Sequence, residues 1–117
     1  MSIKIIPLFL KIHDILPPYP VSILDSDGDV VDITSATIYC TMKNAKTGEL
    51  KINRRSSGIN ILDGENGQFE FQWEVGDTDE IGIFYIEFEI HPFLGGKYTV
   101  PARDRAKVVI SQSLDLE

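Results

Sequence analysis

Two segments of the chain alternate strictly between apolar and polar residues. In residues 69–74 an aromatic side chain occupies every second position, and residues 84–90 follow the same rule from Phe84 to Ile90. Successive side chains of a strand point to opposite faces of its sheet, so each segment has one apolar face and one polar face. The pattern predicts two strands of an antiparallel β-protein, each burying one face.

The rest of the sequence predicts further short strands separated by turns. Turn-forming residues recur about every 8–12 residues, and no window keeps the period of an amphipathic helix for more than about two turns. We therefore expect an all-β fold, an antiparallel β-sandwich that forms a single domain over residues 1–117. The other expected strands lie at residues 3–12, 21–24, 36–43, 50–54, 59–62, 97–100 and 105–110.

The link between the two alternating segments indicates a sandwich rather than one closed sheet. The link of residues 74–82 is longer than a hairpin turn requires. A hairpin would also place the carboxylates of both strands on the same face of one sheet. Like charges directly opposite one another in a sheet are destabilising. We therefore expect the link to cross from one sheet to the other, with Trp73 and Phe88 facing each other across the core.

Charge excludes some classes of partner. The chain has 117 residues and a net charge of −7, and the residues from Ile59 onward carry four basic and twelve acidic side chains. Neither a nucleic-acid partner nor an anionic membrane surface is expected, because both require a basic footprint. The apolar N-terminal stretch is short and interrupted by Pro7, so we expect neither a signal peptide nor a membrane span.

Residues that could support catalysis are few. Cys40 is the one cysteine, and it alternates with Ile38 and Met42, which predicts a small buried apolar side chain rather than a nucleophile. His13 and His91 are too few to form a metal site without further partners. We expect no catalytic residues, no metal and no cofactor, and therefore no enzymatic activity.

The acidic segment 25–29, Asp-Ser-Asp-Gly-Asp, has two interpretations. Aspartate and glycine dominate turns, because aspartate accepts hydrogen bonds from its own backbone and glycine tolerates positive φ. A calcium loop of the EF-hand type would need glycine at its sixth position and glutamate at its twelfth, where this chain has Val30 and Ala36. A turn is the favoured interpretation, and a weak surface calcium site is the alternative.

The N-terminal stretch holds more apolar residues than one edge strand needs, and Pro7 within it indicates an edge or a kink. One interpretation is a strand covered on both faces. The other is an edge or patch that binds a neighbouring protein. The candidate partner-binding residues are Ile3, Ile5, Leu8, Phe9 and Leu10.

Several segments, in order, resemble a known phage family. They are residues 13–18, 21–28, 31–38, 67–73, 76–79 and 82–90, and the resemblance runs from about Leu10 to Ile110. The chain is similar to the immunoglobulin-like domain at the N-terminus of the baseplate upper protein of tailed phages, which also occurs as small stand-alone phage proteins. It departs from antibody domains, because it lacks their Cys-Trp-Cys framework and has Phe84 near the place of a tyrosine corner.

The resemblance implies an immunoglobulin-like sandwich of about seven to nine strands. It also implies a structural role, as a non-catalytic protein-binding module of the tail, baseplate or capsid surface. The location would then be the virion, assembled in the host cytoplasm, and the partners other phage structural proteins or further copies of the chain. The larger family members continue into a coiled coil and receptor-binding parts, which we do not expect here because the sequence stops at Glu117.

A carbohydrate- or calcium-binding β-sandwich module is the alternative function. It would need an exposed cluster of aromatic side chains, for which Tyr19, Tyr85, Phe93 and Tyr98 are the candidates. A small hydrolase is a further class, but the sequence offers no polar constellation for one.

Overall fold

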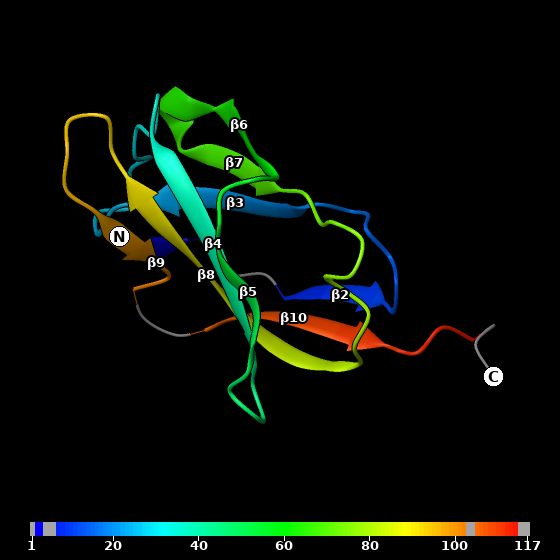
Figure 1. The fold of residues 1–117 in the computed structure, drawn as a ribbon. Helices are drawn as coiled ribbons and strands as arrows, with labels where there is room; N and C mark the ends of the chain where they lie inside the picture. Colours follow the sequence, from blue (N-terminus) through cyan, green and yellow to red (C-terminus); the bar gives the residue numbers. More distant parts are fainter. Residues whose placement is uncertain (1, 4–6, 103–104, 115–117) are drawn as a thin grey trace.

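The fold consists almost entirely of β-strands (Figure 1). The computed structural model describes residues 2–3, 7–102 and 105–114. No helix in this part of the chain could span a membrane. Ten strands and one short 3-10 turn lie in the described residues: β1 (Ser2–Ile3), β2 (Leu8–Lys11), β3 (Tyr19–Leu24), β4 (Thr37–Asn44), β5 (Leu50–Arg55), β6 (Ile59–Asp63), η1 (Gly64–Asn66), β7 (Gln68–Phe71), β8 (Gly82–His91), β9 (Tyr98–Val100) and β10 (Ala106–Ser111).

The strands form two sheets whose order is that of an immunoglobulin-like sandwich. One sheet has the order β1-β3-β7-β6, and the other has the order β2-β10-β8-β4-β5, with β9 also paired to β8. Lettered in chain order, the first sheet corresponds to strands A, B, E and D, and the centre of the second to G, F and C. The predicted fold class is therefore confirmed. In Figure 1, β3, β7 and β6 lie in one layer, and β4, β8 and β10 in the other.

The first expected strand, residues 3–12, is two separate strands in different sheets. β1 pairs antiparallel with β3 in one sheet, whereas β2 pairs parallel with β10 in the other sheet. Pro7 lies immediately before β2 and has no N–H to offer a ladder. This division explains why the described residues form ten strands, one more than the sequence pattern predicts.

The core is built from the alternating segments, as expected. Phe69, Phe71 and Trp73 are buried, and so are the apolar residues of the 84–90 segment. The ring of Phe88 packs edge-on against Phe69 and Phe71, with centroids 5.1 and 6.2 Å apart, whereas Trp73 packs against Phe71 at 5.3 Å. Across the core, Phe88 thus contacts aromatic rings of β7 and also Tyr19 of β3, at 5.9 Å, whereas Trp73, which follows β7, packs beside Phe71 at one end.

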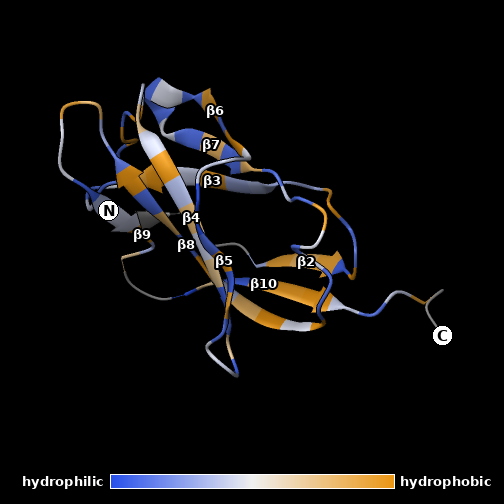
Figure 2. Cartoon of the chain, in the orientation of Figure 1, coloured by the Kyte–Doolittle hydropathy of each residue, from blue (hydrophilic) through white to orange (hydrophobic). Residues whose placement is uncertain are grey.

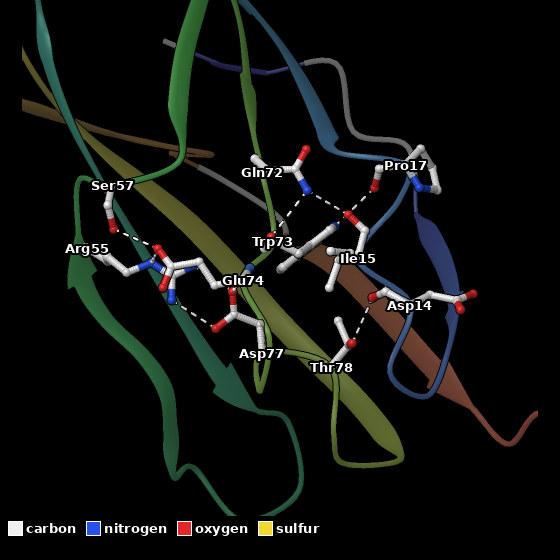
Figure 3. A network of polar contacts seen from close by, with 10 residues as sticks. All are labelled: Asp14, Ile15, Pro17, Arg55, Ser57, Gln72, Trp73, Glu74, Asp77 and Thr78. Atoms are coloured by element: carbon white, nitrogen blue, oxygen red, sulfur yellow. Dashed lines mark hydrogen bonds and ion pairs between the residues drawn. The ribbon is translucent and has the colours of Figure 1, made fainter.

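The link after Trp73 crosses between the sheets, as the carboxylate argument predicted. A partly buried ion pair holds it: Arg55 Nη1 and Nη2 donate to Asp77 Oδ1 and Oδ2 at 2.8 and 2.6 Å (Figure 3). Asp77 Oδ2 also accepts the backbone N–H of Glu74 at 2.7 Å. Although Gly76 and Asp77 are residues typical of turns, Asp77 is only 6% exposed.

A second set of hydrogen bonds fastens the same link to the segment between β2 and β3 (Figure 3). Each of them joins a side chain of the 72–78 region to a backbone carbonyl of the 14–17 region. Together they fix the end of β2 relative to the core. They are Gln72 Nε2 to Ile15 O (2.7 Å), Trp73 Nε1 to Pro17 O (3.1 Å) and Thr78 Oγ1 to Asp14 O (2.7 Å).

Candidate partner-binding surface

The structure divides the five candidate residues of the N-terminal stretch. Phe9 is 70% exposed, whereas Leu10 is buried in the core and Leu8 is partly buried against it. The side chain of Leu10 therefore belongs to the core beside β10, and that of Leu8 packs partly against it, because alternate side chains of β2 point inward. Of the β2 candidates, only Phe9 offers a largely exposed side chain to a partner. The backbone of Ile3 pairs with Ile23 in the other sheet. Ile5 lies outside the described residues.

Phe9 belongs to an apolar row that crosses three neighbouring strands. Phe9 on β2 is directly opposite Val109 on β10, and Val109 is opposite Ile83 on β8. All three side chains point away from the core, because their neighbours on each strand are the inward ones. Ile83 is 48% exposed. These three residues, here called the apolar row, lie on the outer face of the larger sheet.

The row continues beyond β8. The backbone N–H of Ala45 donates to Ile83 O at 2.9 Å, which brings the turn after β4 alongside the row. Ala45, Ile81 and Ile83 line a shallow, mainly apolar hollow beside this turn. In Figure 2 the hydrophobic colour covers much of β2, β10 and the adjoining start of β8. The apolar surface therefore extends from the edge strand β2 to the turn that follows β4.

Sequence reasoning identified only the β2 part of this row. Ile83 and Val109 occupy positions where the alternating pattern would place polar residues. Each lies in a short run in which consecutive residues, facing opposite sides of the strand, are all apolar. These runs are Ile83-Phe84 and Val108-Val109-Ile110, and Leu8-Phe9-Leu10 is a third. Such runs indicate a strand with two apolar faces. Three of them on strands that pair would have indicated an apolar outer surface.

The opposite end of the same outer face is polar and internally paired. Glu89 accepts hydrogen bonds from Arg54 Nε at 2.8 Å and from Lys97 Nζ at 3.2 Å. The hydrogen bond from Arg54, followed by that from Lys97, lowers the pKa of Glu89. The Arg54 guanidinium also lies 4.6 Å from the centre of the Tyr39 ring. Because these groups already form hydrogen bonds and ion pairs with one another, this end of the face has fewer free groups for a partner to bind than the apolar end has.

The acidic segment 25–29 folds as a turn that its own hydrogen bonds explain. Asp25 Oδ1 accepts the backbone N–H groups of Asp27 and Asp29 at 2.9 and 3.0 Å. The carboxylates of the three aspartates come within 4.8 Å of one another. Because the Asp25 carboxylate already caps the turn, the loop geometry requires no ion.

The aromatic residues of the carbohydrate alternative do not form an exposed cluster. Tyr19 is buried in the core, and burial raises the pKa of its hydroxyl to about 12. Tyr98 is partly buried against the core, and the ring of Tyr85 is covered by Arg105 at 4.7 Å. Of the four candidates only Phe93 projects freely. A flat stacking platform for a sugar is therefore not formed by these side chains.

Cys40 is buried in the core, where burial raises the pKa of its thiol well above the ordinary value. Since the thiolate is the reactive form, we expect Cys40 in the folded protein to react with a thiol reagent at least about 100-fold more slowly than in urea. Reaction rates measured with Ellman's reagent check this. Equal rates in the two conditions would place the thiol at the surface and contradict the fold.

Comparisons of the chain with family models, with curated proteins and with solved structures give no match.

Proposed function

We propose that the chain is a phage virion structural protein, a non-catalytic module that binds other structural proteins of the tail, baseplate or capsid surface. Two lines support this. The sequence resembles a family of immunoglobulin-like phage domains, and the strand order is that of an immunoglobulin-like sandwich. Because a fold alone does not determine function, the proposal depends on the features of the protein surface.

The observation that carries the proposal is the apolar row. Phe9, Val109 and Ile83 lie side by side on strands that hydrogen bond to one another; Phe9 is largely exposed, Ile83 about half exposed and Val109 partly buried. Contiguous apolar patches on soluble proteins mark surfaces that another molecule covers. The row begins at β2, an edge strand of its sheet. A partner can therefore contact both the outer face and the edge.

The carbohydrate- or calcium-binding alternative has weaker support. Its aromatic candidates are mostly buried or covered, and the acidic turn is explained by its own hydrogen bonds. A calorimetric titration with calcium that released heat at a stoichiometry of about one would revive it.

Replacing Phe9 with serine tests the proposal. We expect the variant to fold, because Phe9 is largely exposed, and to be incorporated into phage particles at least about tenfold less than the unaltered protein, because an exposed aromatic at the centre of an interface is a typical hot spot. The measurement is quantitative mass spectrometry of purified particles, made by complementing a phage that lacks the gene.

The matched control is Leu62→Ser on β6. The side chain of Leu62 is 63% exposed, a fraction similar to that of Phe9, but Leu62 lies on an edge strand of the other sheet. We expect normal incorporation of this variant. Absence of the unaltered protein from particles would refute the virion role, and equal incorporation of all three proteins would refute the apolar row as the binding surface.

A further inference from the structure

The basic side chains of this acidic protein fall into two groups. In one group each cation is paired with a carboxylate: Lys51 with Asp79, Arg55 with Asp77, and both Arg54 and Lys97 with Glu89. Lys11, Lys43, Lys46, Arg105 and Lys107 form the second group, and none of them has an ion pair among the residues that the structure describes. Arg54 and Lys97 of the first group lie at the polar end of the outer face, whereas Lys51 lies near the turn after β4, where Asn44 Nδ2 donates to Glu80, the second carboxylate beside Lys51.

The unpaired cations surround the apolar row. Lys107 on β10 and Lys43 on β4 are both opposite Tyr85, which is two residues beyond Ile83 on the outer face of β8. The Arg105 guanidinium lies 4.7 Å from the centre of the Tyr85 ring. Lys43, Lys107 and Arg105 thus flank Tyr85, one pleat away from the apolar row, and Glu87 is the one acidic residue lining the hollow that Lys43 and Arg105 share.

Lys11 and Lys46, also of the second group, lie beside the apolar row as well. Lys11 lies two residues beyond Phe9 on the same face of β2, with its Nζ 3.4 Å from Ser111 Oγ. Lys46 is in the turn beside Ala45 and Ile83. Thus an apolar strip is bordered by lysine and arginine in a chain whose net charge is −7.

We propose that this surface binds an acidic, apolar segment of another protein. Apolar side chains of the segment cover Phe9, Val109 and Ile83, and its carboxylates pair with Lys43, Lys107 and Arg105. Complementary charge at the rim gives such a complex its orientation and its association rate. The inference rests on the proposed protein-binding role and specifies the chemistry of the partner.

The arrangement favours a protein over other polyanions. A nucleic acid needs a continuous basic track for its phosphates, whereas here the strip between the cations is apolar. The net charge of −7 repels a nucleic acid or an anionic membrane at a distance, beyond the reach of this local basic border. A short acidic and apolar segment meets the border and the strip together.

The test uses two synthetic peptides on the isolated protein. One alternates leucine with glutamate, and the other replaces every glutamate with lysine. Binding is followed by titrating the ¹⁵N-labelled protein and mapping the amide shifts. We expect the acidic peptide to shift amides of β2, β10 and the first half of β8, and to bind at least about tenfold more tightly than the basic peptide. Raising NaCl from about 50 mM to about 300 mM should weaken it several-fold, because salt screens exposed charges.

Charge-reversal variants make the test specific. We expect the double variant Lys43→Glu/Lys107→Glu to bind the acidic peptide at least about tenfold more weakly. The matched control is Lys97→Glu, the same charge change at the paired, polar end of the outer face, which should leave binding unchanged. Equal losses in both variants would show a general charge effect and overturn the proposal.

Other outcomes also decide the matter. Equal binding of the two peptides, or no binding of the acidic one, overturns the acidic partner. Tighter binding of duplex DNA or of phosphatidylserine vesicles at these strands assigns the surface to those ligands instead. Dimerisation that Phe9→Ser abolishes assigns it to a second copy of the chain. None of these results alters the incorporation of the protein into particles, so failure here is distinguishable from failure of the virion role.

Discussion

Replacing Trp73 with alanine will lower the free energy of unfolding by about 3–5 kcal/mol, the usual cost of truncating a large core aromatic. Trp73 is 2% exposed, and its ring packs edge-on against Phe71 with centroids 5.3 Å apart. The substitution leaves a cavity where the link leaves β7. It also leaves the Pro17 carbonyl without the N–H that Trp73 donates at 3.1 Å.

The control for this prediction is Trp73→Phe, which keeps an aromatic ring but removes the indole N–H. We expect a smaller loss of about 1–2 kcal/mol, from the missing hydrogen bond and the reduced volume. Urea denaturation followed by circular dichroism measures both variants. A loss below about 1 kcal/mol for Trp73→Ala would mean that the side chain contributes little to the core, contrary to the structure.

Replacing Asp77 with alanine will destabilise the protein by about 2–3 kcal/mol, because the partly buried Arg55 guanidinium then keeps only its longer ion pair with Glu74, at 3.5 Å. The Asp77 carboxylate accepts both terminal nitrogens of Arg55 and the backbone N–H of Glu74. The Arg55 guanidinium also lies 5.0 Å from the centre of the Phe71 ring, so the loss reaches the aromatic core.

Asp79→Ala is the matched control in the same link. Asp79 pairs with Lys51, but its side chain is about half exposed, and surface ion pairs contribute about 0–1 kcal/mol. We expect this variant to lose less than about 1 kcal/mol on the same urea curves. Adding Arg55→Ala to each variant completes the comparison. With Asp77→Ala the double variant should lose clearly less than the sum of its single losses, whereas additivity would show that the two residues do not interact.

Much of the fold follows from the alternation of side chains. Phe69, Phe71 and the apolar residues of 84–90 are buried as the period of two requires, and the crossover between their strands followed from the repulsion of carboxylates. These features are local, or depend on pairs of neighbouring strands. They can therefore be inferred before any long-range contact is known.

The buried polar link and the full extent of the apolar row could not be inferred in this way. Asp77 has the sequence context of an exposed turn, and only the position of Arg55 on β5 explains its burial. Val109 and Ile83 become one surface with Phe9 only through the parallel pairing of β2 with β10. That pairing joins the two ends of the chain, and a pattern within one segment does not contain it.

The most direct test of the central claim is site-specific photocrosslinking in assembled particles. A benzophenone amino acid is placed at Phe9, and in a second protein at Leu62 on the opposite sheet. We predict that the probe at position 9 attaches the chain to one virion protein, and that the probe at position 62 gives no such product. A crosslinked product from position 62 with none from position 9 would contradict the account.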